Sequence, residues 1–173
     1  MTSALFNTEH LRCRRWAAED FDALYAVYSD TEAMRWVGDG EPITRSACEQ
    51  WFKVTEANYA KRGYGMFSLE SIISGSVVGF CGLVHPGGQT EPEVKYAFLR
   101  PCWGKGLASE AVPALLAYGN AKHGLVRIIA TVAPANIASQ RVLIKSGMRL
   151  REQHQNEDGS LSNVYEWLAP SAA

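Results

Sequence analysis

The chain has 173 residues, of which 47% are hydrophobic, and its formal net charge is -1. This length and apolar share suit one domain with a full core, so we expect a single domain over residues 1–173. The balanced charge offers no basic field for nucleic acid and no polybasic segment for a membrane surface, so neither partner class is expected.

The first ten residues lack the charged and apolar regions of a signal peptide, and no apolar run is long enough to cross a bilayer. The chain has four scattered cysteines, with no C-x-x-C pair and no histidine at zinc-ligand spacing, at Cys13, Cys48, Cys81 and Cys102. We therefore expect a cytoplasmic protein with free thiols and no metal.

The first elements are a strand and two helices. Weak alternation over residues 11–16 predicts a strand, and apolar residues at helical spacing predict a helix around residues 21–28. Thr44 is a suitable N-cap for a second helix that runs to about Arg62 and ends at Gly63.

Three strands are predicted next. Residues 64–73 and 76–84 have β-like composition and are joined by Ser74-Gly75, which indicates a hairpin. Residues 91–99 alternate, with Val94, Tyr96 and Phe98 on one face of the strand and the intervening residues on the other.

A helix is then expected over residues 107–122, closed by His123-Gly124, followed by a central strand over 125–133. Asn136 begins a short helix that ends at Gly147, and residues 148–155 and 162–168 form a last hairpin across Asp158-Gly159. The order β-α-α-β-β-β-α-β-α-β-β predicts a mixed α/β layer around one sheet.

The segment Trp103-Gly104-Lys105-Gly106-Leu107-Ala108 lies between a strand and a helix. Its glycines allow close backbone approach, and the start of the helix leaves N–H groups unpaired, so an anion such as a pyrophosphate suits it better than a plain turn. A P-loop is not favoured, because Leu99 and Gly106 occupy the positions of its first glycine and its Ser or Thr. A Rossmann fingerprint is not favoured either, because Ser109 replaces its third glycine.

Three segments together indicate a family. They are EVKYAFLRPCWGKGLASEA at residues 93–111, NIASQRVLIKSGM at residues 136–148 and LRCRRW at residues 11–16. These segments resemble those of the GNAT acetyltransferases, and within them the branch of the RimJ/RimL-type ribosomal-protein N-terminal acetyltransferases. The superfamily pattern is [QR]-x-x-G-x-[GA]; Gly106 and Ala108 match it, whereas Trp103 replaces the Gln or Arg, as is common in this branch.

The resemblance implies the acyl-CoA N-acyltransferase fold, a mixed, mostly antiparallel sheet with about four flanking helices. Acetyl-CoA would lie where a parallel pair of strands, residues 91–99 and 125–133, splays apart, and no metal is implied. The residues implied to bind the coenzyme are Phe98, Leu99, Trp103, Gly104, Lys105, Gly106, Leu107, Ala108, Asn136 and Ser139, the pyrophosphate being held by backbone N–H groups of 104–108. Asn136 can equally be a plain helix N-cap.

The resemblance also implies direct transfer of an acetyl group to a primary amine, without an enzyme nucleophile. Glu93 is the candidate general base, because a carboxylate beside an apolar cleft suits that role, and Glu91 is the second choice. The tyrosine that many GNAT enzymes use as general acid is replaced here by Leu143, so Ser139 or water is expected to supply that proton.

The acceptor amine stays open between a protein N-terminus, including that of a ribosomal protein, and a small molecule; the chain is expected to be a monomer or homodimer. By resemblance the acceptor site is lined by the first two helices, their loop and the final hairpin, which carry Tyr25, Tyr28, Trp36, Trp51, Tyr59, Trp167, Asp39, Glu41, Glu157 and Asp158. The first-strand residues Arg12, Arg14 and Arg15 are interpreted as the surface charge of an edge strand or as a substrate-facing patch. A non-catalytic acyl-CoA-binding module on the same fold is the alternative function.

Overall fold

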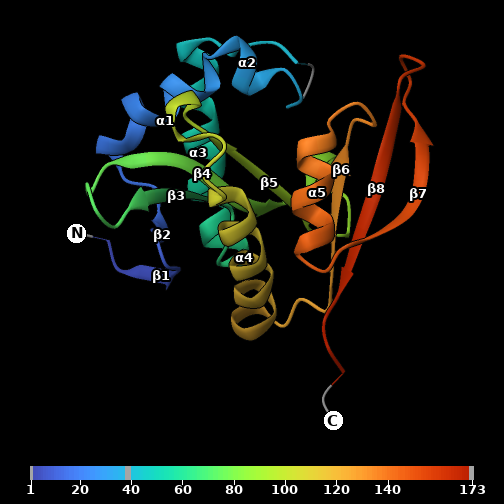
Figure 1. Ribbon diagram of the computed structural model, residues 1–173. Coiled ribbons are helices and arrows are strands. Elements are labelled where there is room, and N and C mark those ends of the chain that lie inside the picture. The colour runs from blue at the N-terminus through green and yellow to red at the C-terminus, as the bar shows by residue number, and fades with distance from the viewer. Residues whose placement is uncertain (1, 38–39, 172–173) are drawn as a thin grey trace.

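A computed structural model describes residues 2–37 and 40–171, and eight strands in these residues form one sheet (Figure 1). The strands are β1 (Ala4–Asn7), β2 (Leu11–Arg15), β3 (Met66–Ser71), β4 (Val77–Val84), β5 (Glu93–Phe98), β6 (Arg127–Val132), β7 (Arg149–Gln155) and β8 (Leu161–Leu168). Their order across the sheet is β1-β2-β3-β4-β5-β6-β8-β7. Every neighbouring pair is antiparallel except β5 and β6, so the expected mixed, mostly antiparallel sheet is confirmed.

Helices cover both faces of the sheet. They are α1 (Phe21–Tyr28), α2 (Thr31–Met34), α3 (Arg45–Arg62), α4 (Leu107–His123) and α5 (Ile137–Lys145). One apolar cluster lies between the sheet and α4 and α5, with Phe67, Leu115 and Leu143 fully buried in it. A second lies against α1, α2 and α3 and includes Leu24 and Phe80. The molecule therefore has three layers, with the sheet in the middle (Figure 1).

The ends of the helices follow local sequence signals. The Oγ1 atom of Thr44 accepts a hydrogen bond from the Ala47 N–H at 3.1 Å, as expected of an N-cap. Gly63 ends α3 with φ 82° and Gly124 ends α4 with φ 64°, both in the left-handed region that favours glycine. Local chemistry thus determines where these helices begin and end.

The parallel pair separates almost at once. Glu93 of β5 pairs with Ile129 of β6, and the Ile129 N–H donates to the Pro92 carbonyl at 2.9 Å. No other paired position of these strands is present in the described residues. Beyond Glu93 the two strands diverge, which leaves backbone and side chains of both facing an open gap, and the expected splayed parallel pair is confirmed.

The structure contains two elements that the sequence did not indicate. The strand β1 lies outside β2 and makes the edge of the sheet, and α2 is a short helix between α1 and α3. The Oδ1 atom of Asp30 caps α2 by accepting from the Glu32 and Ala33 N–H groups at 2.9 and 3.2 Å. The described residues therefore form five α-helices rather than about four, because one side-chain cap stabilises a single extra turn.

The interpretation of Arg14 as surface charge is wrong. β2 is an interior strand, and the Arg14 side chain is buried between acids from two other segments. Within residues 2–37 and 40–171, every helix is too short or too polar to span a membrane.

Candidate active site

A cavity of about 840 Å³ opens where β5 and β6 diverge. This volume is within the range of small-molecule and cofactor sites. Its wall combines residues 94–98 of β5 and 130–132 of β6 with residues 102–104 and 106–109 of the loop and first turn of α4. The wall continues over residues 136, 138, 139, 142 and 143 at α5 and, on the other side of the sheet, over residues 28, 32, 33, 35–37, 51, 54, 55 and 58.

The glycine loop at the start of α4 forms an unfilled cradle. Gly104 and Gly106 have φ values of 71° and 76°, and a Cβ built on either would meet no described atom within 4 Å. None of the backbone N–H groups of residues 104–109 donates a hydrogen bond to another residue of the described chain. Free N–H groups at the positive end of a 17-residue helix form an anion site, and the open space above the glycines leaves room for the anion.

The structure brings most of the predicted coenzyme residues together. The cavity wall includes Phe98, Trp103, Gly104, Gly106, Leu107, Ala108, Asn136 and Ser139. Leu99 and Lys105 are not on this wall. Leu99 packs against the second apolar cluster, and Lys105 lines a separate pocket together with His10 and Ser71. The part of Lys105 that we assign to the cradle is its free backbone N–H group.

Trp103 is held against the end of β5. Its Nε1 donates to the Phe98 carbonyl at 2.8 Å, while 44% of its surface remains exposed. A large apolar side chain fixed by its polar atom and left open at a cavity wall offers a flat surface for a ligand.

Asn136 caps α5, because its Oδ1 accepts from the Ser139 N–H at 3.2 Å. The Ser139 hydroxyl lies 2.5 Å from the Tyr96 hydroxyl of β5, and both residues line the cavity. Burial raises the pKa of Tyr96, and the hydrogen bond with Ser139 lowers it by less. Tyr96 was missed as a functional residue, although alternation had placed it on the same face as Val94 and Phe98.

The hydroxyl pair lies close to the position that the sequence left without a tyrosine. Leu143, which stands at that position, is 1% exposed and contributes only its apolar side chain to the cavity wall. A tyrosine from β5 therefore lies beside the serine of α5, although the two are 43 residues apart in the chain.

Glu93 is buried at the point of divergence, with 4% of its surface exposed. Its carboxylate accepts from Lys95 Nζ at 2.8 Å and from Gln89 Nε2 at 3.3 Å. Lys95 lines the cavity, whereas Glu93 does not. Glu91, the second choice, ion-pairs with Arg127 at 3.3 Å and Arg151 at 2.9 Å and is also absent from the wall.

The far end of the cavity is aromatic. Among the residues expected near the acceptor, Tyr28, Trp36 and Trp51 line the cavity. The remaining described ones do not, namely Tyr25, Tyr59, Trp167, Glu41, Glu157 and Asp158; Asp39 lies outside the described residues. No residue of β7 or β8 within the described chain reaches the wall, so the final hairpin does not contribute to it.

Trp16 was not predicted at this site, yet it lines the cavity directly after β2. Its backbone N–H donates to the Tyr59 hydroxyl at 3.1 Å, and that hydroxyl donates to the Met66 carbonyl. Its ring packs on Phe52, with centroids 4.4 Å apart, and edge-on against Tyr28. The Nε1 atom of Trp16 has no hydrogen-bond partner among the described residues, so apolar packing holds the ring.

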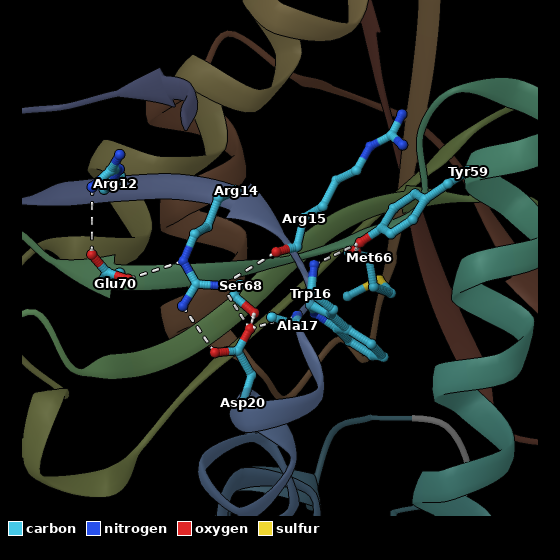
Figure 2. Close-up of polar contacts among 10 residues, drawn as sticks. All are labelled: Arg12, Arg14, Arg15, Trp16, Ala17, Asp20, Tyr59, Met66, Ser68 and Glu70. Atoms are coloured by element: carbon cyan, nitrogen blue, oxygen red, sulfur yellow. Dashed lines mark hydrogen bonds and ion pairs between the residues drawn. The ribbon is translucent and has the colours of Figure 1, made fainter. Parts of the chain in front are cut away.

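A buried ionic network lies beside Trp16 (Figure 2). Arg14 donates to both Asp20 carboxylate oxygens at 2.7 and 2.8 Å and to Glu70 at 2.9 Å. Asp20 also accepts from the Ser68 hydroxyl and the Ala17 N–H, each at 2.9 Å. Burial raises the pKa of Asp20, but these donors together lower it further, so the carboxyl is ionised. The network fixes the chain on both sides of Trp16.

The cysteines and acids of the described residues form no metal-binding group. No cluster of three or more His, Cys, Asp or Glu side chains within residues 2–37 and 40–171 is arranged to hold a metal ion. All four cysteines are free thiols, and Cys13, Cys48 and Cys81 are buried.

Comparison with known proteins identifies the family. A family model described as an acetyltransferase (GNAT) domain matches residues 10–149. The uncharacterized N-acetyltransferase YnaD of Bacillus subtilis (strain 168) is 31% identical over 142 residues, which cover 82% of this chain and 81% of that protein.

Solved structures share the fold. An acetyltransferase (GNAT family) from Bacillus anthracis has a TM-score of 0.81 at 27% identity, covering 94% of this chain and 96% of that one. The structure titled RimL, a ribosomal L7/L12 alpha-N-protein acetyltransferase in complex with coenzyme A, has a TM-score of 0.81 at 15% identity. The similarity covers 96% of this chain and 98% of that chain. At this level of identity it supports only the fold.

Proposed function

Because this chain belongs to the GNAT family of N-acetyltransferases, we propose that it takes the acetyl group of acetyl-CoA and transfers it directly to a primary amine. The observation that carries the proposal is the glycine cradle at the start of α4. It combines free backbone N–H groups, a helix N-terminus and open space in one wall of a cavity that reaches the gap between β5 and β6.

The residues of the wall suit the parts of the coenzyme. The N–H groups of residues 104–108 would hold the pyrophosphate, and Asn136, which lines the cavity, would contact the pantetheine arm. The exposed ring of Trp103 provides an apolar surface next to the cradle. Bound in this way, acetyl-CoA would supply an activated acetyl thioester at the divergence of the two strands.

Transfer requires two proton movements. The amine nitrogen bonds to the acetyl carbon while the carbon–sulfur bond breaks, so one proton must leave the nitrogen and one must reach the sulfur. We assign the first proton to Glu93 and the second to the hydroxyl pair of Ser139 and Tyr96. Because Glu93 lies behind Lys95 and off the cavity wall, its proton would arrive through one bridging water.

The coenzyme assignment is tested by calorimetric titration with acetyl-CoA, with ATP and NADH as controls. We expect only acetyl-CoA to bind, in the micromolar range, which corresponds to about -8 kcal/mol. A folded protein that binds ATP or NADH but not acetyl-CoA would overturn the assignment.

The cradle itself is tested by Gly106→Val. Binding should weaken roughly 100-fold, because the loss of two hydrogen bonds to a charged group costs about 3 kcal/mol. The matched control is Gly75→Val at the β3–β4 turn, where φ is 69° and a Cβ also meets no described atom within 4 Å. Both variants carry the same kind of backbone strain, so equal acetyl-CoA affinity in the two would show that the pyrophosphate lies elsewhere.

A further inference from the structure

The part of the cavity that the coenzyme residues leave free lies on the side of α2 and α3. Resting on the proposed acetyl transfer, this part is where the acceptor amine must enter, because it is continuous with the gap between β5 and β6. Its wall contains side chains that no step of the transfer uses.

Large apolar side chains are exposed together at this end. Trp36, Trp51 and Val54 line the cavity and are 42%, 36% and 48% exposed. Single exposed apolar residues are common on proteins, but several that converge on one cavity mark a surface that binds an apolar group.

The aromatic side chains are held in place from behind. The Trp51 ring lies edge-on against buried Tyr28, with centroids 4.6 Å apart and an interplanar angle of 88°. The guanidinium of Arg35 lies 4.8 Å from the centroid of the Trp36 ring. Both indoles are therefore oriented before a ligand arrives, which favours stacking with a flat group.

The charges of the wall disfavour a polycation. Its charged side chains in the described chain are Arg35, Lys95 and a single carboxylate, Glu32. Glu93 neutralises Lys95 from behind but does not reach the cavity. A ligand with several ammonium groups would find a single carboxylate partner and a cation nearby, whereas a ligand with one amine carries one positive charge and meets less repulsion.

We propose that the acceptor is a small aromatic monoamine, whose ring binds between Trp36 and Trp51 and whose amino group points to the divergence of β5 and β6. A polyamine and a peptide N-terminus are the competing acceptor classes. Neither would use the exposed indoles as fully, and the polyamine would also meet the cations of the wall.

The first test compares acetylation of 2-phenylethylamine, spermidine and a trialanine peptide by the wild-type protein. We expect kcat/KM for 2-phenylethylamine to be about tenfold or more above both others, the factor that one or two aromatic contacts provide. Preference for spermidine or the peptide would overturn the aromatic acceptor and leave acetyl transfer intact. Binding of acetyl-CoA without acetylation of any of the three would also overturn it, whereas failure to bind acetyl-CoA would overturn the proposed function.

The second test uses Trp36→Leu and Trp51→Leu. Each should raise the KM for 2-phenylethylamine about tenfold and change kcat and the Kd of acetyl-CoA less than about twofold. Trp167→Leu is the matched control, because Trp167 is a half-buried tryptophan of β8 that does not line the cavity. An unchanged KM in both cavity variants, or the same rise in the control, would remove the indoles from acceptor binding.

Discussion

Glu93 and Lys95 point to the same side of β5, and only the lysine reaches the cavity. The buried carboxylate thus has one fixed partner toward the site and a second, Gln89, behind it. In this arrangement Glu93 can take a proton from the amine only through an intervening group such as a water molecule. Its role as general base is therefore tested by substitution of this one residue.

We expect Glu93→Gln to lower kcat about 100-fold at neutral pH and to leave the Kd of acetyl-CoA unchanged, because a general base acts on the amine and not on the coenzyme. Steady-state kinetics and calorimetry measure the two quantities. Glu91→Gln is the companion variant, since Glu91 is bonded to Arg127 and Arg151 away from the cavity. If Glu93→Gln retains full turnover, Glu93 is not the base. Acetyl-CoA binding without acetylation of any amine by the wild type would instead support the non-catalytic binding module.

The hydroxyls of Tyr96 and Ser139 predict a coupled effect. Ser139→Ala and Tyr96→Phe should each lower kcat, Ser139→Ala by about 100-fold, and the double variant should be no worse than the more severe single one. Residues that act as one unit behave in this way. Tyr118→Phe is the control, because Tyr118 is a tyrosine of α4 that does not line the cavity. Multiplied losses in the double variant would show that the two hydroxyls act separately.

Between elements, the network of Arg14, Asp20, Ser68 and Glu70 joins β2, β3 and the turn that leads into α1 (Figure 2). Trp16 lies within the segment that this network fixes. The network therefore both stabilises the sheet and fixes the position of Trp16 in the cavity wall.

We predict that Asp20→Asn lowers the free energy of unfolding by about 3 kcal/mol, because removal of one partner leaves a buried charge only partly paired. Urea denaturation measures this change. The matched control is Asp22→Asn two residues away, whose side chain is 85% exposed and ion-pairs with Arg45 at 3.3 Å. Its cost should be below about 1 kcal/mol. Equal costs for the two variants would contradict the importance of burial here.

At the scale of the whole molecule, a group of hydrogen bonds to one carboxylate joins the edge of the sheet to α4. Glu110, in the first turn of α4, accepts from the His10 N–H at 2.7 Å and from its Nδ1 at 2.9 Å, and also from the Thr8 hydroxyl. The hydrogen bond to Glu110 is the main cause that raises the pKa of His10 above its ordinary value of 6.5. The β1–β2 hairpin is thereby attached to the helix that begins at the glycine cradle.

This contact predicts a dependence of stability on pH. The pKa of His10 is raised in the folded state. The contribution of protonated His10 to the free energy of unfolding is therefore fully present when the pH is below the ordinary pKa of histidine, and it is lost as the pH rises through the raised pKa. The difference in urea midpoint between wild type and His10→Gln should therefore be larger at about pH 5.5 than at about pH 9. The control variant is His154→Gln, on exposed β7. A difference independent of pH would mean that the ion pair does not contribute.

Several features of the site were predictable because their cause is local. Two glycines ahead of a helix indicated an anion cradle, and alternation along β5 separated Glu93 and Lys95 from Tyr96. Trp16 and the Tyr96–Ser139 pair were not found, since a side-chain contact across 43 residues leaves no signal in local spacing. Arg14 was misinterpreted, because an outer strand of four residues, β1, turned an apparent edge strand into an interior one.

By itself, the sequence determined the helix ends, the turns, the glycine cradle and the resemblance to the GNAT family. These depend on backbone dihedral angles and capping groups within a few residues of each other. Only the tertiary structure decided that Glu93 lies behind Lys95, that Tyr96 meets Ser139 and that four tryptophans line one cavity. These facts depend on which strands pair and which helix faces pack, and packing selects among many arrangements that the same local signals allow.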